Sequence, residues 1–538
     1  MERKDMKLGF IGFGNMAQAI AEGLLRSKAL EPEQICACAK DWDKLCAATQ
    51  PRGMRPCRDA REVAEAADVV IVAVKPHLIE EVLSPVRGQL ADKAVVSVAA
   101  GWPFERYEAL LPGTRHLSTM PNTPVRVCAG VFLLEEKHSL TPEEYVLVQE
   151  LFGHPICSGD TATKILWLRR HEPEIYAKTA YFLTGSSFLT ARLTGKYVID
   201  QALAKGSFRP LYQADGSVNE AECGLYCRPD QIAACAWSTD IVGTVTPEAA
   251  AQTGLAAGTP VITGTGDSTA EAISVGLVEP GTAFFQYGSS MFYYYCTDHF
   301  VGSYVSPQGN GALKGGKAFT VPGTYCLGDG TNAAGTLTRW VRDLLYSKEL
   351  EAEKQGGENA YAVMAREAAA VPPGSDGLMM LPYIYGERSP LQDAEATGML
   401  FGLKGTHGRA QINRAALEAV GYSTYQHLLL FEELGVPPRR IITAGGGTKN
   451  AAWMQIICDM AGMPLTIPEP FQCSSYGDAM LAAVGVGALE SFAALRAALP
   501  QGRILQPDRK NHEFYQEHYP IFRDLYLENR DRMHRMQK

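Results

Sequence analysis

Asp267 stands where the sequence could place a general base. It follows the glycine-framed stretch at residues 264–266, which comes directly after a predicted strand at residues 261–263, and Ser268 is next to it. A carboxylate at the end of a strand can accept the proton of a hydroxyl group bound beside it. The same carboxylate could instead cap the helix that the small residues 269–273 predict. The motif by itself leaves both interpretations open.

Two further turns offer groups that could hold a phosphate or a nucleotide. Residues 288–290, Gly-Ser-Ser, form the predicted hairpin turn after a strand at residues 281–287, and their N–H and hydroxyl groups are donors for phosphate oxygens. Residues 444–450 contain consecutive glycines between a predicted strand at residues 440–443 and a predicted helix. That position suits a nucleotide base or a phosphate. Each cluster alone would more often be an ordinary turn.

A third glycine motif lies near the amino terminus. Gly12, Gly14 and Ala17 make the pattern G-x-G-x-x-A between a predicted strand at residues 7–11 and a predicted helix that extends to residue 25. In this context the first glycine permits a tight turn, the second lets the backbone approach a pyrophosphate, and the alanine allows the helix to pack closely on the strand. The helix N-terminus favours an anion because its N–H groups are unpaired. The motif therefore predicts dinucleotide binding.

The elements around this motif predict the fold of the first part of the chain. Strands are expected at residues 7–11, 34–39, 68–74, 94–98 and 116–120. Strands that alternate with helices at this spacing form an α/β, doubly wound parallel sheet of the Rossmann type. The second strand ends at Lys40 and Asp41, where such folds bind the adenosine ribose. These two residues leave the choice between NADP and NAD open, because the lysine would attract a 2′-phosphate and the aspartate would repel it.

Composition limits the remaining classes of function. The 538 residues exceed what one core accommodates, so several domains are expected. The net charge of −9 and the lack of a Lys/Arg block argue against a nucleic acid or an anionic membrane as partner, although small phosphorylated ligands need only local positive groups. The first residues do not have the pattern of a signal peptide, and no apolar run is long enough to span a membrane, so we expect a cytoplasmic protein.

The cysteines do not predict a metal site. In a cytoplasmic protein the 13 cysteines are expected to be reduced thiols. Cys223, Cys227 and Cys235 lie close together in the sequence, but they have no fourth cysteine or nearby histidine to complete a zinc site. We interpret them as small apolar residues in packing positions.

The amino-terminal motifs together resemble pyrroline-5-carboxylate reductase. Four segments in the order of that family carry the likeness, which covers about residues 5–152: residues 9–17, 73–77, 98–101 and 120–124. The resemblance implies that the dinucleotide phosphates are lined by Gly12, Gly14, Asn15 and Met16. It also implies that the cofactor is flanked by Ala73, Lys75 and Pro76, and that Asn122 lies near the nicotinamide. The helical domain that dimerises and supplies much of that family's substrate pocket has no counterpart in the sequence. Cofactor binding is therefore expected without a complete acceptor pocket.

The later motifs together resemble the FGGY family of carbohydrate kinases, closest to its xylulokinase-like members. Two signatures carry the likeness, which covers about residues 154–530: residues 159–168, and residues 398–403 with 411–412 and 415–418 after them. The resemblance implies an actin-like architecture of two ribonuclease-H-type lobes. It also implies ATP with Mg²⁺, and a small sugar or polyol that meets ATP in the cleft between the lobes.

The same resemblance assigns roles to individual residues by position. Asp267 matches the general base that takes the proton from the sugar hydroxyl, and Ser268 lies beside it at the sugar. Positions that contact ATP are Ser289, Ser290, Gly335, Gly446 and Asn450, of which the two serines match the turn that holds the phosphates. Asp200 also lies in a family motif, and we interpret it as structural.

The two likenesses meet at residues 151–160 and predict three domains, at residues 1–153, 154–276 and 277–538. Family kinases begin with a strand and an Asp-x-Gly-Thr hairpin that grips phosphate and helps to place Mg²⁺. In this chain the reductase-like domain occupies that position. The first lobe of the kinase is therefore expected to be incomplete.

This loss predicts a difference between the two lobes. The missing strands would form the centre of the first lobe's sheet, so we expect residues 154–260 to pack poorly or to expose a sheet edge. The second lobe, at about residues 277–505, is expected to be intact. After it, an aromatic stripe at helical spacing from Phe514 to Tyr526 predicts a helix docked on that lobe.

Three interpretations of function follow. In the first, the chain is a carbohydrate kinase impaired by the loss of its first phosphate hairpin. In the second, it is an NAD(P)H-dependent reductase whose substrate pocket is missing or comes from another chain, and the sequence allows a homodimer. In the third, it is a chimera of the two that has nucleotide-binding lobes but no activity. The kinase is favoured because its resemblance covers more of the chain.

Overall fold

The computed structural model describes residues 6–26, 29–99, 102–121, 132–134, 138–141, 144, 148, 160–213, 215–469, 473–500 and 502–537. Most of the predicted join, residues 151–159, lies outside these ranges, as does Asn122. The chain forms two compact units. The first extends to Ala180 and includes residues 207–213 and 218–231, and the second comprises the rest of the chain.

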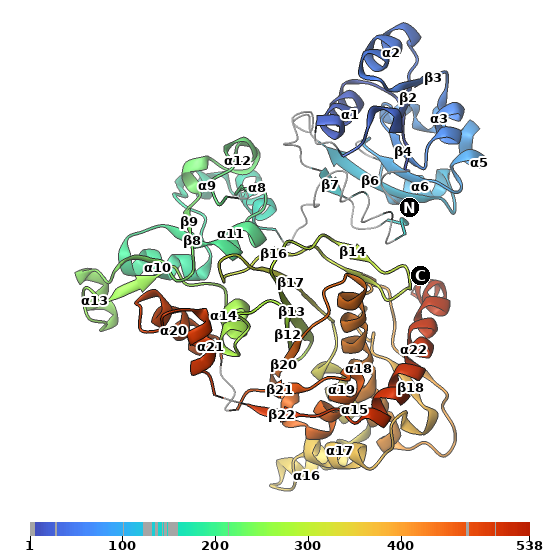
Figure 1. Ribbon diagram of the computed structural model, residues 1–538. Coiled ribbons are helices and arrows are strands. Elements are labelled where there is room, and N and C mark those ends of the chain that lie inside the picture. Colours follow the sequence, from blue (N-terminus) through green and yellow to red (C-terminus); the bar gives the residue numbers. More distant parts are fainter. Residues whose placement is uncertain are drawn as a thin grey trace. The chain divides into compact units, whose positions relative to one another are not determined.

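A seven-stranded sheet is the core of the first unit (Figure 1). In spatial order its strands are β3 (Arg55–Cys57), β2 (Ile35–Cys38), β1 (Leu8–Ile11), β4 (Val69–Val72), β5 (Ala94–Ser97), β6 (Arg115–Pro121) and β7 (Phe132–Leu134). The strands from β3 to β6 are parallel, and β7 pairs antiparallel with β6. The order places β1 beside β4, which is where the direction of winding reverses and where such folds bind ligands. The predicted doubly wound sheet is confirmed.

Both faces of this sheet are buried, because consecutive residues of its strands point to opposite faces and are apolar. Phe10 and Ile71 belong to one buried cluster, together with Ile20 of helix α1 (Asn15–Arg26). Ile11 and Val72 belong to a second cluster on the opposite face. Continuous apolar runs of this kind are typical of parallel strands that are buried on both sides. The other helices of this sheet are α2 (Trp42–Thr49), α3 (Ala60–Ala66), α4 (Ile79–Leu83), α5 (Arg87–Leu90) and α6 (Phe104–Leu110).

Between residues 160 and 276 the described residues form only small sheets. Strands β8 (Val198–Asp200) and β9 (Ala234–Ala236) make one parallel pair, and β10 (Ile241–Thr244) and β11 (Pro260–Ile262) make one antiparallel pair. The helices here are α8 (Thr161–His171), α9 (Pro173–Lys178), α10 (Gly185–Thr194), α11 (Gln201–Ser207), α12 (Glu220–Tyr226), α13 (Pro247–Thr253) and α14 (Asp267–Ser274). The side chains of Phe188, Leu189 and Ile241 remain 55%, 62% and 49% exposed, which agrees with the expected incomplete packing.

A second seven-stranded sheet forms the core of the carboxyl-terminal lobe. In spatial order its strands are β16 (Lys317–Ala318), β17 (Tyr325–Gly330), β13 (Met291–Thr297), β12 (Thr282–Tyr287), β20 (Arg440–Ala444), β21 (Leu465–Ile467) and β22 (Arg503–Leu505). The central strand β12 is antiparallel to β13 and parallel to β20. The short strands β14 (Tyr304–Val305), β15 (Ala312–Leu313), β18 (Met379–Leu381) and β19 (Met399–Phe401) make two separate pairs. Apart from these pairs, the strands described in this lobe therefore form one continuous sheet.

Helices cover the two faces of this sheet in Figure 1, where α14, α20 (Ser474–Gly485) and α21 (Phe492–Ala498) lie on one side. On the other side are α15 (Gly335–Leu345), α17 (Ala360–Ala369), α18 (Arg409–Glu433), α19 (Ala451–Ala461) and α22 (Arg509–Met536), and α16 (Ser347–Lys354) follows α15. The alternation of β12 explains the arrangement. Phe284 belongs to the cluster under α14 and α20, whereas Phe285 belongs to the cluster under α18.

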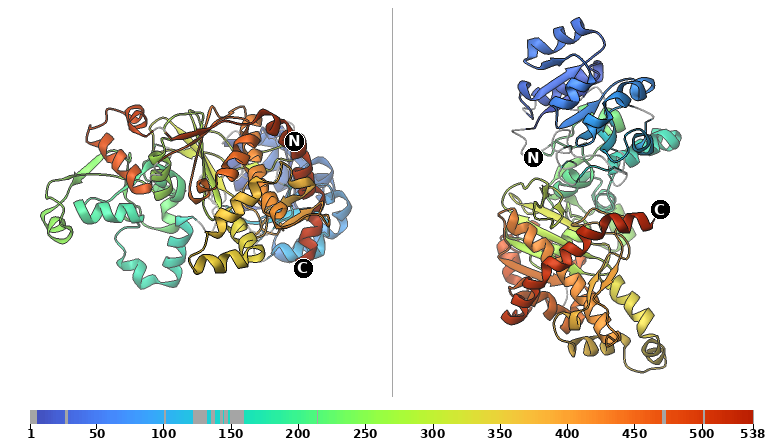
Figure 2. Two further views of the ribbon diagram at one scale, coloured as in Figure 1. Left: turned by 90° about the horizontal axis from the view of Figure 1, so that it is seen from below. Right: turned by 90° about the vertical axis from the view of Figure 1, so that its right-hand side faces the viewer.

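The predicted docking helix is confirmed as α22, which Figure 2 shows in dark red, ending at the carboxyl terminus. The stripe residues Tyr515, Tyr519, Phe522, Leu525 and Tyr526 are buried in the core of the lobe.

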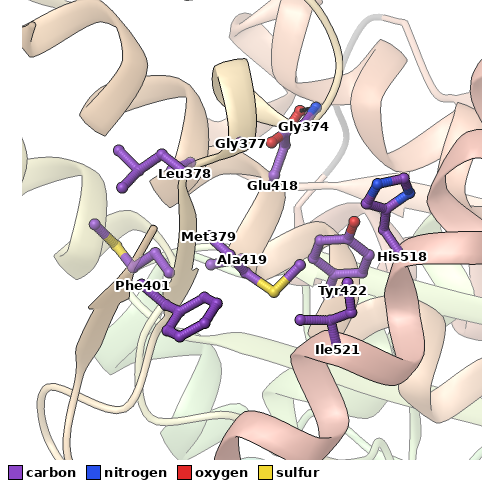
Figure 3. A pocket seen from close by; sticks show the side chains of 12 residues that line it. Gly374, Gly377, Leu378, Met379, Phe401, Glu418, Ala419, Tyr422, His518 and Ile521 are labelled. Atoms are coloured by element: carbon purple, nitrogen blue, oxygen red, sulfur yellow. Dashed lines mark hydrogen bonds between the residues drawn. The ribbon is translucent and has the colours of Figure 1, made fainter. Parts of the chain in front are cut away.

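The signature at residues 415–418 has a structural role in this helical layer. The buried carboxylate of Glu418 accepts hydrogen bonds from the Arg414 Nε, the Tyr515 hydroxyl and the Ser375 hydroxyl, at 2.9, 2.8 and 2.8 Å. It thereby ties α18 to α22 and to the loop at residues 374–377. A mostly apolar cavity of about 250 Å³ remains beside it, and Figure 3 shows Tyr422, Ile521 and Phe401 among the residues around that cavity.

Candidate active site

Three loops meet at the carboxyl ends of β12 and β20. The hairpin at residues 288–290 connects β12 to β13, the glycine-rich loop at residues 445–450 follows β20, and α15 begins at Gly335. Because β12 and β20 are parallel neighbours, their carboxyl ends lie at the same edge of the sheet. The edge therefore brings together residues that are far apart in the sequence.

The hairpin is fixed to the start of α15 by backbone hydrogen bonds. The Gly288 carbonyl accepts from the Gly335 N–H at 3.0 Å, and the Ser289 carbonyl accepts from the N–H groups of Ala334 and Thr336 at 3.1 and 2.9 Å. A Cβ at position 335 would lie 2.5 Å from the Gly288 oxygen, so this approach requires glycine. Ser289, Ser290 and Gly335 are thus neighbours, and Ser289 is exposed to solvent.

The glycine-rich loop divides into packing glycines and one open glycine. A Cβ at Gly445, where φ is +93°, would lie 2.6 Å from the Tyr287 oxygen, and a Cβ at Gly447 would lie 2.8 Å from the Tyr287 Cβ. A Cβ at Gly446 would meet no atom within 4 Å. Gly446 therefore leaves room for a ligand, whereas the other two hold the loop against β12. The sequence motif predicted the loop, but only the packing in the structure distinguishes the two glycines that hold the loop from the one that leaves room for a ligand.

Asn450 has a structural partner as well as its predicted ligand role. It is the N-cap of α19, and its Oδ1 accepts the Trp453 N–H at 3.0 Å. This bond fixes the side chain at the end of the glycine-rich loop.

Asp267 and Ser268 are the first two residues of α14. Asp267 is exposed, and its Oδ1 accepts the N–H of Ser268 at 2.7 Å. The N-cap position belongs to Gly266, so the carboxylate occupies the first helical position and not the cap. The Ser268 hydroxyl lies 3.0 Å from the hydroxyl of Tyr294 on β13. The carboxylate is therefore accessible on a helix that is tied to the sheet of the second lobe.

Two acidic residues that the sequence did not single out lie near Asp267. Burial raises the pKa of Glu271 on α14, and the negative charge of Asp267 raises it further, while a hydrogen bond from Gln286 at 3.1 Å opposes the shift. Burial also raises the pKa of Asp478 on α20, and Asp267 again adds to the shift. The four-residue spacing of Asp267 and Glu271 on one helix was a signal for the first of these contacts.

Asp200 holds the loop that precedes α14, in agreement with its interpretation as structural. It is 2% exposed, and its Oδ2 accepts the Thr265 hydroxyl at 2.8 Å. Burial raises its pKa to about 6, and hydrogen bonds from Thr265 and from backbone N–H groups of α11 oppose that shift. The carboxylate thus joins α11 to the loop that carries Asp267.

The dinucleotide motif has the expected geometry at the carboxyl end of β1. Gly12 has φ +93°, and a Cβ there would lie 2.9 Å from the backbone of Ala73. A Cβ at Gly14 would meet no atom within 4 Å, and Ala17 is fully buried. The first glycine thus serves the close approach of two loops, and the second leaves space in front of α1. Asn15 and Met16 begin that helix.

The loop after β4 lies beside this motif. The Ala73 N–H donates to the Ile11 carbonyl at 2.9 Å, and Lys75 and Pro76 follow as exposed residues. These residues and the glycine motif line one edge of the sheet, and Asn122 lies outside the described residues. The pyrophosphate of a dinucleotide fits at this edge, because Gly14 faces open space at the start of a helix.

Two charged residues, Lys40 and Asp41, follow β2 and differ in their partners. Asp41 is the N-cap of α2: its Oδ1 accepts the Lys44 N–H at 3.1 Å, and its Oδ2 pairs with the Lys44 Nζ at 3.0 Å. The hydrogen bond from the Lys44 backbone, followed by the Lys44 side chain, lowers the pKa of Asp41. Lys40 is exposed beside it. The aspartate is therefore paired within the first turn of α2, and Lys40 is an exposed cation next to it.

Within the ranges that the structure describes, no group of three or more His, Cys, Asp or Glu side chains is arranged to hold a metal ion. None of the helices in those ranges combines the length and the apolar character needed to cross a membrane.

Comparison with known families assigns different parts of the chain to different families. The N-terminal domain of the FGGY family of carbohydrate kinases matches residues 138–274, and the C-terminal domain of that family matches residues 287–486. The family described as NADP oxidoreductase, coenzyme F420-dependent, matches residues 7–101. The kinase match begins before residue 154, the predicted start of the kinase-like part.

Individual relatives give the same picture. Xylulose kinase of Escherichia coli (strain K12) is 27% identical over 477 residues, which cover 86% of this chain and 94% of the relative. Gluconokinase of Bacillus subtilis (strain 168) is 29% identical over 377 residues, which cover 69% of this chain and 72% of the relative. The crystal structure of xylulose kinase from Rhodospirillum rubrum is 26% identical, with a TM-score of 0.63, and covers 85% of this chain and 89% of that chain. The alignments with the two xylulose kinases, over 86% and 85% of the chain, extend into the amino-terminal part.

Proposed function

We propose that the chain transfers phosphate from ATP to a hydroxyl group of a sugar or polyol. The proposal is supported by the matches to the two domains of the FGGY family of carbohydrate kinases, which follow the match to an NADP oxidoreductase family. The observation that carries this proposal is the exposed carboxylate of Asp267 on a helix tied to β13, the strand that begins at the Ser289–Ser290 hairpin. The proposal divides the chain at residues 1–153, 154–276 and 277–538.

In this proposal Asp267 accepts the proton of the sugar hydroxyl while that oxygen attacks the terminal phosphate of ATP. A carboxylate within hydrogen-bond reach of the reacting hydroxyl is suited to this role. Ser268 binds the sugar beside it. Exposure keeps Asp267 accessible, and the hydrogen bond from its neighbour's N–H orients the carboxylate.

ATP fits the edge formed by the three loops. Ser289 and Ser290 supply donors for the phosphates, Gly335 allows the hairpin to approach α15, and Gly446 and Asn450 line the nucleotide side. Mg²⁺, when bound with ATP, would neutralise charge on the phosphate oxygens. Because the first phosphate hairpin of the family is replaced by the amino-terminal domain, we expect a rate that is lower by orders of magnitude than that of a complete kinase.

The substrate class follows from the relatives, which are named xylulose kinases and gluconokinases. We propose a ketose, a polyol or a sugar acid. ADP release should be measured with purified full-length protein, ATP, Mg²⁺ and a panel of these compounds. We expect at least one compound to raise ADP release above the rate with ATP alone. A panel in which no compound does so contradicts the kinase proposal.

A second candidate function is NADP binding by the first domain. Lys40 favours NADP over NAD, because it is exposed where the adenosine ribose would lie while Asp41 is engaged by Lys44. Fluorescence titration with NADPH and NADH should show tighter binding of NADPH. Oxidation of NADPH in the presence of pyrroline-5-carboxylate would extend the proposal to a reductase. Binding without oxidation would support a domain that holds the cofactor but has no acceptor pocket.

The setting of the protein is also proposed. The net charge of −9 and the metabolic relatives support a cytoplasmic protein that acts on small molecules. A homodimer is the assembly proposed from the reductase-like part. Light scattering of the purified protein would test it, since a monomeric mass at all concentrations would contradict the dimer.

A further inference from the structure

The edge of the carboxyl-terminal sheet that lies opposite the candidate active site contains an open cleft of about 640 Å³. Three arginines line it, Arg439, Arg440 and Arg496, together with Glu279, Asp298 and the segment at residues 280–282. Thr282 and Arg440 are the first residues of β12 and β20, whose other ends carry the hairpin and the glycine-rich loop. Five residues of strand separate the two edges by about 17 Å.

Two of the three guanidinium groups have partners within the protein. The Arg439 Nη2 donates to the Pro280 carbonyl at 2.8 Å, and its side chain crosses Gly281, where a Cβ would collide with it. Arg496 on α21 forms an ion pair with Glu279. These contacts fix two positive groups at the rim of the cleft.

The third guanidinium, that of Arg440, forms no hydrogen bond or ion pair with any residue in the described ranges, and the residue is partly buried. Burial lowers the pKa of Arg440, the charge of Arg496 lowers it further, and Glu279 only opposes these effects. The other carboxylate of the cleft, Asp298, accepts from the His299 Nδ1 at 2.7 Å. Three arginines therefore face two carboxylates, and both carboxylates already have partners.

A partly buried cation that no carboxylate pairs with directly is costly, and an anion bound beside it lowers that cost. Guanidinium groups bind phosphate oxygens through pairs of parallel N–H bonds, which a single positive charge on a flexible chain does not reproduce. We propose that this cleft binds the phosphate group of a small molecule, either inorganic phosphate or a phosphate monoester, with Arg440 as its central ligand. The distance from the hairpin edge makes this site separate from the ATP site, so the inference does not depend on the proposed function.

The proposal can be tested by calorimetric titration of the full-length protein with inorganic phosphate and with a pentose monophosphate. We expect saturable binding of one or both, up to about 10 mM ligand. Arg440→Gln should weaken binding at least about 10-fold. Arg509→Gln is the matched control, because it removes the same charge from a side chain that is 92% exposed, at the first position of α22, and that does not line the cleft. Equal affinities for the two ligands would mean that the site contacts the phosphate alone, and tighter binding of the monoester would mean that the cleft also holds the sugar.

Three outcomes would overturn the proposal. The first is no saturable binding by the unmodified protein, and the second is binding by Arg440→Gln with the affinity of the unmodified protein. The third is loss of phosphate binding in Ser290→Ala but not in Arg440→Gln, which would assign the binding to the ATP edge. Circular dichroism should verify that each variant is folded. If Arg440→Gln does not fold, Arg440→Lys replaces it: weaker binding by this variant supports the proposal, and unchanged binding contradicts it.

Discussion

The two parts of the kinase-like region differ in how their strands bury apolar side chains. In residues 277–538 a seven-stranded sheet has helices on both faces, and Phe284 and Phe285 on its central strand are fully buried. Among the described residues of the range 181–276, the strands form pairs only, and Phe188 and Leu189 on α10 are more than half exposed. Two-stranded sheets are small, so α10 packs on β8, β10 and β11 through Ser187, Thr190 and Thr194 and leaves these two apolar side chains uncovered.

Asp267 belongs to the smaller part by sequence, but contacts with the larger part hold it in place. Ala272 and Ile273 of α14 are in the same buried cluster as Phe284 and Leu481. Gly477 on α20 has no room for a Cβ against the backbone of Ala270, which shows how closely the two helices approach. Contacts with the second lobe therefore hold the carboxylate in position.

Asp267→Asn is expected to have the largest effect. It removes the proton acceptor, so kcat/KM for the best sugar of the panel should fall by about 10²–10⁴-fold. The free energy of unfolding should stay the same because the side chain is exposed. Glu248→Gln, at an exposed acid in the first turn of α13, is the control and should leave kcat/KM unchanged. A similar loss in both variants would contradict a specific role for Asp267.

Alanine substitution of one phenylalanine in each part tests the packing difference directly. Phe285→Ala should lower the free energy of unfolding by about 3–5 kcal/mol because it leaves a cavity in the core. Phe188→Ala should change it by no more than about 0.5 kcal/mol because the side chain is already half in solvent. Urea denaturation measures both. Equal losses would mean that the α10 face is covered in solution and would contradict the difference in packing between the two parts.

The pH dependence of stability should reveal Asp200, which joins the smaller part to the Asp267 loop. Burial raises its pKa to about 6, so between about pH 4 and pH 6 the folded protein keeps a proton that the unfolded chain releases. The free energy of unfolding should therefore fall as the pH rises through this window, by at most about 3 kcal/mol. Asp200→Asn should remove the contribution of this carboxylate and leave those of Glu222 and Glu387, whose pKa values burial raises to about 7 and about 8. An unchanged pH profile in the variant would assign the titration to another group.

Two glycine substitutions at the edge formed by the three loops should have smaller effects, which can be measured separately. Gly335→Ala should cost about 1–3 kcal/mol of stability, because its Cβ would press on the Gly288 oxygen and displace the hairpin. Gly446→Ala should change stability by less than about 0.5 kcal/mol, because its Cβ enters open space, but it should weaken ATP binding. Calorimetry with ATP separates the two effects. Unchanged ATP affinity in Gly446→Ala would place the nucleotide elsewhere.

Much of this arrangement was predictable from local sequence patterns. The strand expected at residues 281–287 is β12 at Thr282–Tyr287, and the turn at residues 288–290 is its hairpin. The helix expected from the small residues after Asp267 is α14. These predictions succeeded because periodicity and turn residues act over a few neighbouring positions.

The sequence did not reveal the features that depend on packing between distant segments. The negative charge of Asp267 acts on Asp478 because α20 lies against α14, and no local pattern connects residues so far apart. The division between Gly446 and its two neighbours depends on how closely the loop approaches Tyr287. The interpretation of Asp267 as a helix cap was also settled only by the backbone, which assigns the cap to Gly266.

Transfer of radiolabelled γ-phosphate from ATP to the sugar, compared between the unmodified protein and Asp267→Asn, tests the central claim most directly. The account predicts slow formation of a labelled sugar phosphate by the unmodified protein and loss of this product in the variant, with both proteins equally folded. Formation of the same amount of product by Asp267→Asn, or no labelled sugar from the unmodified protein with any compound of the panel, would contradict it.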